Sequence, residues 1–128
     1  LGFRDAPHAA GAGLLDDAAV ATDDGSVGHH GLVTQLLDAS LDRDPHAVVY
    51  TCGPPGMLEA VRARCAERQV PSQLALESGM ACGYGACFGC VVPLATGGYA
   101  RVCVDGPVFA GEQLPPGALA AAHGEAPR

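Results

Sequence analysis

Four cysteines near the middle of the sequence constrain this chain more than any other feature. They are Cys82, Cys87, Cys90 and Cys103, with the spacing C-x4-C-x2-C-x12-C. Three glycines lie between the first and the third of them, Gly83, Gly85 and Gly89. Glycine permits positive φ, and a tight loop lets backbone N–H groups approach sulfur atoms. The run therefore predicts a loop that folds around a centre bound by four thiolates.

The spacing favours one kind of centre over its competitors. The first three cysteines match the plant-type pattern for a [2Fe–2S] cluster, which needs two thiolates on each of two irons. Structural zinc sites favour paired C-x2-C knuckles, whereas this chain has one such pair, preceded by a four-residue gap. Six cysteines in 128 residues are also sparse for a disulfide framework, and no signal peptide is visible. We expect a [2Fe–2S] cluster, with a zinc ion and disulfides or free thiols as the weaker alternatives.

The remaining cysteines and the histidines do not extend this metal site. Cys65 falls in a helical stretch and is expected to be a small buried side chain. The five histidines show no metal-binding spacing, and His29 and His30 fall in a turn.

Composition excludes several classes of protein. The formal net charge is −7, from 14 acidic and 7 basic side chains, so no basic surface is available for nucleic acid. No run of 18 uncharged apolar residues occurs, so we expect no membrane span and a cytoplasmic protein. The sequence starts at Leu1 without the features of a signal peptide, which suggests a chain whose upstream part is missing.

Hydrophobic patterning predicts an α/β fold. The first half alternates strands and helices, with strands at 18–22 and 47–52 and helices at 31–40 and 57–69. The apolar run at 47–52 suits a strand buried on both faces. This rhythm predicts a parallel sheet with crossover helices, whose ligands bind beyond the carboxyl ends of the strands. Those ends carry two Gly-bearing loops, Asp23-Asp24-Gly25 and Cys52-Gly53-Pro54.

The second half predicts a smaller lobe of short strands and loops. A strand at 73–77 leads into the cysteine loop, and a hairpin of 91–92 with 101–104 returns Cys103 to it. We therefore divide the chain into a partial nucleotide-binding domain at 1–70, a cluster-binding domain at 71–114 and a disordered tail at 115–128.

These residues resemble a known family, the electron-transfer subunits of class B (NAD-dependent) bacterial dihydroorotate dehydrogenase. Those subunits are ferredoxin–NADP reductase-like flavoproteins with a [2Fe–2S] domain, and the resemblance is to their C-terminal part. The matching segments are 22–28, 31–34, 52–54, 57–58, 77–78, 80–90, 98–99, 101–103 and 105–109. The resemblance covers roughly residues 1–114 and is most specific at 80–90 and 103–109.

The resemblance implies a role for each matching site residue. Cys82, Cys87, Cys90 and Cys103 would bind the cluster. The Cys52-Gly53-Pro54 loop would lie beside the nicotinamide, with a buried strand-end residue as the alternative for Cys52. Asp23 and Asp24, with Gly25, would contact the adenosine ribose and favour NAD over NADP, and an ordinary solvated turn is the alternative.

The resemblance also implies an electron relay with a partner. An FMN-containing catalytic subunit would oxidise dihydroorotate in pyrimidine biosynthesis, and electrons would reach FAD and then NAD in a hetero-oligomer. The flavin-binding signature of the family is not found in this sequence, so we expect FAD to bind poorly and no substrate chemistry to occur on this chain alone. The alternatives are a reductase subunit of another iron–sulfur flavoenzyme, linked to sulfide or ferredoxin, and a zinc-stabilised interaction module.

Overall fold

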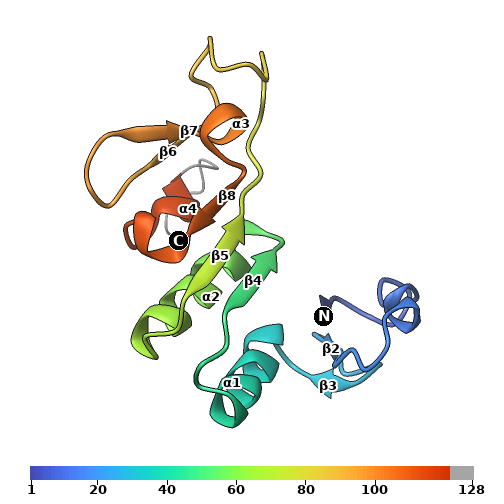
Figure 1. Ribbon diagram of the computed structural model, residues 1–128. Coiled ribbons are helices and arrows are strands. Elements are labelled where there is room, and N and C mark those ends of the chain that lie inside the picture. The colour runs from blue at the N-terminus through green and yellow to red at the C-terminus, as the bar shows by residue number, and fades with distance from the viewer. Residues whose placement is uncertain (122–128) are drawn as a thin grey trace. The chain divides into compact units, whose positions relative to one another are not determined.

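The computed structural model describes residues 1–121, which form two compact units (Figure 1). The first unit is Leu1–Asp44 and the second begins at Pro45. None of the helices in residues 1–121 has the length and apolarity that crossing a membrane requires.

The first unit is a small parallel sheet covered by one long helix. Strands β1 (Gly2–Phe3), β2 (Ala21–Thr22) and β3 (His29–His30) lie in the order β1-β2-β3, and all pairs are parallel. Ala21 and Thr22 on the central strand are fully buried, and α1 (Val33–Arg43) packs against that strand. The connection between β1 and β2 consists of turns and a short 3-10 helix, η1 (Ala12–Leu14). The predicted strand at 18–22 and helix at 31–40 are thus confirmed in type.

The second unit is built on a mixed sheet of the order β4-β5-β8. Strands β4 (Val49–Cys52) and β5 (Ser72–Ala75) are parallel and are joined by α2 (Pro55–Glu67). Strand β8 (Val108–Ala110) pairs antiparallel with β5, with Leu74 opposite Phe109. The predicted βαβ connection is confirmed, and the prediction of an α/β fold with it.

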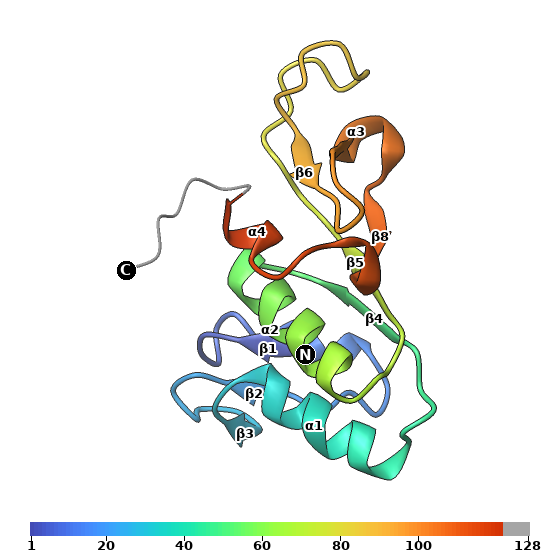
Figure 2. The ribbon, with the colours of Figure 1, turned by 90° about the vertical axis from the view of Figure 1, so that its left-hand side faces the viewer.

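A hairpin and three short helices complete this unit. The hairpin is β6 (Val91–Pro93) with β7 (Tyr99–Arg101), and it turns through Gly97 and Gly98 as predicted. Helix α3 (Val102–Asp105) follows the hairpin, and η2 (Gly111–Gln113) and α4 (Ala118–Ala121) follow β8. Helix α4 packs against α2 and β6 (Figure 2).

One hydrophobic core serves the whole second unit. Its buried members come from α2, the sheet, the hairpin and the C-terminal segment: Leu58, Leu74, Leu76, Cys90, Val92, Ala100, Val102, Phe109, Leu114, Ala118 and Leu119. The compact units therefore meet at residue 44, whereas the sequence predicted boundaries at 70 and 114. The reason is that β5 pairs with β4 on one side and with β8 on the other, so the chain does not separate between them.

Three local predictions need correction. Residues 115–119 are not a disordered tail, because Ala118 and Leu119 are buried and Glu59 Oε1 accepts the Gly117 N–H at 3.0 Å. The part of that prediction that falls on 122–128 lies outside the described residues. Strand β4 is not buried on both faces, since it forms an edge of the described sheet and Tyr50 is 77% exposed.

The third correction concerns the segment that carries the last cysteine. Residues 102–105 form one helical turn instead of continuing the strand. The Asp105 carboxylate accepts the backbone N–H of Arg101 at 2.8 Å, which closes the turn.

Candidate metal centre

A glycine-rich loop between β5 and β6 carries three of the four predicted ligands. The loop has positive φ at Gly83 (74°), Gly85 (87°) and Phe88 (58°), so its backbone turns repeatedly through the left-handed region. It ends at Cys90, which is 3% exposed and belongs to the core. The loop has no regular secondary structure, and its Gly89 N–H donates to Cys87 Sγ.

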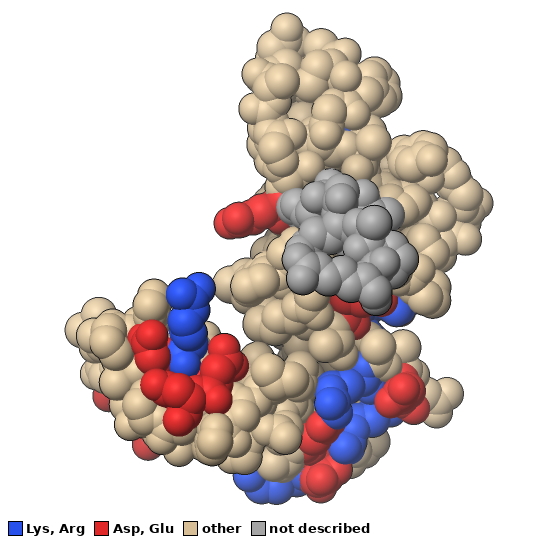
Figure 3. Space-filling model, turned by 180° about the vertical axis from the view of Figure 1, so that it is seen from behind, with Lys and Arg blue, Asp and Glu red and all other residues tan. Residues whose placement is uncertain are grey.

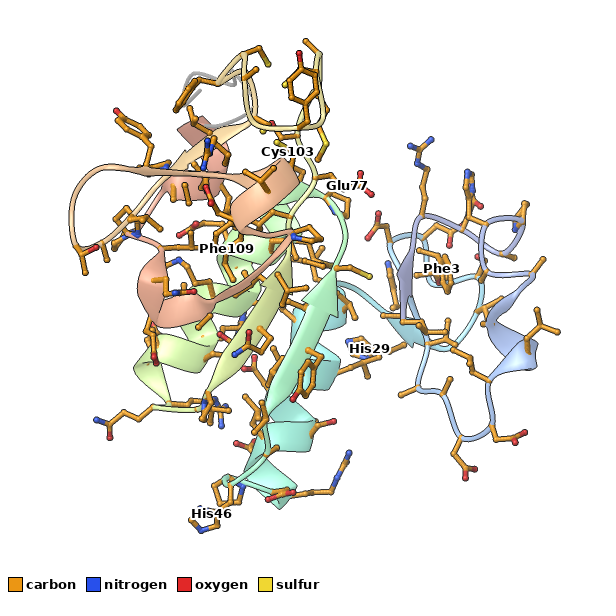
Figure 4. All side chains as sticks on the ribbon, turned by 45° about the horizontal axis from the view of Figure 1, so that its top comes forward. Phe3, His29, His46, Glu77, Cys103 and Phe109 are labelled. Carbon is orange, nitrogen blue, oxygen red and sulfur yellow. The ribbon has the colours of Figure 1, made fainter. Side chains whose placement is uncertain are left out.

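The fourth cysteine, Cys103, lies on α3 against this loop (Figure 4). The Val102 N–H donates to the Cys90 carbonyl oxygen at 2.9 Å, so the helix and the end of the loop are joined directly. Hairpin β6–β7 brings the two segments together, because Val91 pairs with Arg101. The predicted return of the distant cysteine is confirmed, although a helical turn and not a strand presents it.

The four thiols form two hydrogen-bonded pairs. Cys87 pairs with Cys82, and Cys103 pairs with Cys90. The two pairs are close enough that Cys82 acts electrostatically on Cys103. Within residues 1–121, however, no three His, Cys, Asp or Glu side chains are placed to share one metal ion.

Backbone amides lower the pKa of two of these thiols. The Cys87 N–H, the Tyr84 N–H and the Cys87 thiol together lower the pKa of Cys82 to about 6. The Cys103 N–H, with the Cys103 thiol, lowers the pKa of Cys90. The pKa of Cys103 is raised, because its thiol donates to Cys90 and is partly desolvated. Each pair thus contains one sulfur that ionises readily, which suits metal binding because the thiolate is the ligand.

This arrangement fits a dinuclear cluster. A [2Fe–2S] cluster needs two thiolates on each iron, and the site offers two pairs. Amide donors face the sulfurs, since the Gly89 N–H donates to Cys87 Sγ at 3.4 Å and the Gly85 N–H donates to Cys103. Amide dipoles stabilise the negative charge that a thiolate-bound cluster carries.

The predicted nicotinamide loop follows β4. Cys52 is exposed at the end of the strand, which contradicts the alternative that it is a buried strand-end residue. Gly53 has φ of 148°, and a Cβ there would come within 2.7 Å of the Met57 Cε atom. Pro54 caps α2, and its carbonyl oxygen accepts the Leu58 N–H. Cys65, in contrast, is 1% exposed, as predicted for a packing residue.

A small cavity lies between this loop and the cluster lobe. It has a volume of about 30 Å³ and is lined on one side by Gly53 and Pro55 and on the other by Val91 and Val102. Val91 and Val102 are direct neighbours of Cys90 and Cys103 in the sequence. The Cys52-Gly53-Pro54 loop and the cysteine loop are therefore adjacent parts of one unit.

The predicted ribose site lies in the first unit. Asp24 Oδ1 accepts both the backbone N–H and the hydroxyl of Ser26, at 2.9 and 2.6 Å, and these bonds lower the pKa of Asp24. Asp23 is exposed, and Gly25 has φ of 72° as the turn requires. The geometry is that of a self-contained turn, and a ribose contact by these carboxylates stays a prediction.

The sequence analysis did not single out Arg101. Its guanidinium pairs with Asp105, donates to the Gly85 carbonyl oxygen at 3.3 Å and lies over the Phe88 ring at 5.4 Å. One signal was available, because Arg101 is the single Lys or Arg between positions 69 and 127 and stands two residues before Cys103.

Comparisons with known proteins agree with this site. Residues 77–115 match the family described as the iron–sulfur cluster binding domain of dihydroorotate dehydrogenase B. Among solved structures, the chain is similar to one reported as an NADH-dependent reduced ferredoxin-NADP oxidoreductase, with 32% identity and a TM-score of 0.68 over 80% of this chain and 37% of that one. The fold is thus similar to that of this reductase, and the site matches an iron–sulfur cluster binding domain.

The chain is also similar to relatives that carry a more specific name. The chain is 53% identical over 97 residues to a protein of Bacillus caldolyticus, covering 73% of this chain and 36% of the relative. It is 39% identical over 101 residues to a protein of Desulforamulus reducens, covering 77% of this chain and 38% of the relative. Both are named dihydroorotate dehydrogenase B (NAD(+)), electron transfer subunit. Residues 77–115 therefore match the cluster-binding domain of dihydroorotate dehydrogenase B, and the chain spans less than two fifths of the length of these relatives.

Proposed function

We propose that this chain is the iron–sulfur part of a dihydroorotate dehydrogenase electron-transfer subunit. It would relay electrons in pyrimidine biosynthesis from the FMN of a catalytic partner subunit toward FAD and NAD. Cys82, Cys87, Cys90 and Cys103 would hold a [2Fe–2S] cluster, which when bound supplies one-electron transfer. The single observation that carries this proposal is the division of the four thiols into two pairs, three in one amide-lined loop and the fourth on the adjoining α3.

The cysteine spacing supports an iron–sulfur cluster over a single zinc ion, because structural zinc sites favour paired C-x2-C knuckles and this chain has one such pair. The match of residues 77–115 to an iron–sulfur cluster binding domain supports the same choice. All six cysteines are free thiols, as expected in the reducing cytoplasm where we place the protein.

The surface around the loop supports docking of a partner subunit. Three large apolar side chains of the loop are exposed: Met80 (49%), Tyr84 (74%) and Phe88 (61%). Val104 on α3 is also exposed. On the face that Figure 3 shows, the upper end of the molecule carries almost no Lys, Arg, Asp or Glu. Exposed apolar clusters of this kind are typical of protein interfaces. Phe109, in contrast, lies in the core and contributes to packing.

The predicted nicotinamide loop and the predicted ribose site would bind NAD, the final electron acceptor of the proposed relay. We propose that the exposed Cys52 thiol and the Gly53 backbone position a nicotinamide ring, and that Asp23 and Asp24 contact the ribose of NAD. The cavity between Gly53 and Val91 supports a short route between this loop and the cysteine loop.

Anaerobic purification with iron and sulfide quantification tests the proposal. We expect about two irons and two sulfides per chain, the composition of a [2Fe–2S] cluster, together with visible absorption and a paramagnetic signal after reduction. A colourless chain that binds one zinc ion would overturn it. Reconstitution with the catalytic subunit should then allow dihydroorotate to bleach the visible absorption, and no bleaching would exclude this partner.

A further inference from the structure

We infer that Arg101 is a positioning residue that locks the cysteine loop onto α3 and sets the reduction potential of the cluster. The inference rests on the cluster site proposed above. It goes beyond that site because Arg101 is not a ligand and reaches the cysteines only through the groups that hold them.

Arg101 forms hydrogen bonds with both segments that carry the cysteines. Its Nε donates to Asp105 Oδ2 at 3.1 Å and its Nη2 donates to Asp105 Oδ1 at 3.4 Å. Because the backbone N–H of Arg101 also donates to Asp105 Oδ2, at 2.8 Å, the two residues enclose the helical turn that bears Cys103. The fixed fork of the guanidinium leaves Nη1 to donate to the Gly85 carbonyl oxygen at 3.3 Å.

On the cysteine loop, Arg101 contacts Gly85 and Phe88. Gly85 donates its N–H to Cys103 while its carbonyl oxygen accepts from Arg101, so one peptide segment connects the arginine to a predicted ligand. Phe88 holds φ of 58°, which is unfavourable for a bulky residue, and its ring lies under the guanidinium at 5.4 Å. A cation over an aromatic face is attracted to it, so the contact helps to retain this conformation.

The positive charge of Arg101 lies close to the predicted ligands. Arg101 stands two residues before Cys103, and its Nη1 donates to the Gly85 carbonyl oxygen within the cysteine loop. Reduction adds one negative charge to a cluster. A nearby positive charge therefore favours the reduced form, and a nearby negative charge opposes it.

Substitutions of Arg101 and Asp105 distinguish the effect of charge on the reduction potential from the effect of hydrogen bonding on cluster retention. Arg101→Gln removes a positive charge and the fork, so we expect a more negative potential and a cluster that dissociates about tenfold or more faster, the usual range for groups that support metal ligands. Arg101→Lys keeps the charge but not the fork, so the potential should stay near that of the wild type while dissociation is still faster. Asp105→Asn should shift the potential in the opposite direction to Arg101→Gln.

The measurements are a redox titration followed by the visible spectrum, and the rate of cluster loss to a chelator, on the full chain. Arg68→Gln is the matched control, because it removes a positive charge at the end of α2, where the chain enters the amino end of β5 and not the cysteine loop. Potentials that move in the same direction for Arg101→Gln and Asp105→Asn, or do not move, would overturn the inference while leaving the cluster site intact. A wild-type chain without a cluster would overturn both.

Discussion

At the scale of residues, the site depends on sulfur ligands and on the backbone that faces them. Cys90 is buried and pairs with Cys103, whereas Cys87 is exposed and pairs with Cys82. One pair is therefore anchored in the core through Cys90, and the other includes the solvent-exposed Cys87. The anchored pair should matter most for retaining the cluster.

Replacing Cys103 by serine tests this. Serine is a much weaker iron ligand than a thiolate. Loss of the Cys103 thiolate from the anchored pair therefore leaves one iron with a single cysteine ligand. We expect Cys103→Ser to lose most of its iron, sulfide and colour on anaerobic purification. Cys52→Ser is the control, since Cys52 is exposed in another loop and should leave the iron content unchanged. Full iron content in Cys103→Ser would exclude this residue as a ligand.

Two glycines of the loop offer a matched comparison. Gly83 and Gly85 both have positive φ, so alanine at either position costs on the order of 1 kcal/mol in backbone strain. A Cβ at Gly83 meets no atom within 4 Å, whereas a Cβ at Gly85 would lie 3.2 Å from both Arg101 Nη1 and Val104 Cγ2. We expect Gly85→Ala to release its cluster faster than Gly83→Ala, measured as the rate of bleaching with a chelator. Equal rates would mean that the packing of Arg101 and Val104 against Gly85 does not support the loop.

At the scale of elements, α3 shows how much the sequence could predict. The cysteine spacing and the glycines were enough to place the loop and its returning partner. The β-branched Val102 and Val104 indicated a strand, and the turn that forms instead depends on Asp105 accepting the Arg101 N–H. The contact of Arg101 with Gly85 follows from that turn, so a reading of local propensity could not find it.

The C-terminal segment shows the same limit over a longer range. Its Pro- and Ala-rich composition indicated a tail, but Leu119 enters the core and Gly117 binds Glu59, 58 residues earlier in the chain. No local pattern encodes a contact of this kind. Sequence periodicity identified α2 itself, but not the segment that covers it.

The Glu59 site should make this packing sensitive to acid. Burial by itself raises the pKa of Glu59, but the hydrogen bonds from Arg62 and from the Gly117 N–H outweigh it, and the net pKa is lowered. A carboxyl whose pKa is lower in the folded state stabilises the fold above its unfolded pKa of about 4.3, and this stabilisation is lost as the pH falls through the folded pKa. We expect the stability difference between wild type and Glu59→Gln to be largest near neutral pH and to shrink on acidification.

Urea unfolding of the two proteins at a series of pH values measures that difference directly. Arg62 is 8% exposed, so Glu59→Gln leaves a buried cation without its partner, at a cost of about 3–5 kcal/mol. A difference that does not change with pH would mean that Glu59 does not ionise differently in the two states. Glu112→Gln, on an exposed side chain, provides the control.

At the scale of the whole molecule, the two units differ in what they can support alone. The core of the second unit is drawn from residues 58–119, and all four predicted ligands lie in that stretch of the sequence. The first unit supplies the acidic turn but none of the four predicted ligands. The proposed cluster site and the proposed ribose site therefore lie in separate units.

This separation predicts that residues 45–128 hold the cluster without residues 1–44. Because the core, the hairpin and the cysteine loop are all contained in that segment, it should unfold cooperatively and bind about two irons, as the full chain should. Iron content and denaturant unfolding of the segment, compared with the full chain, test this. A segment that fails to fold, while the full chain folds with its cluster, would show that the first unit contributes to the stability of the second.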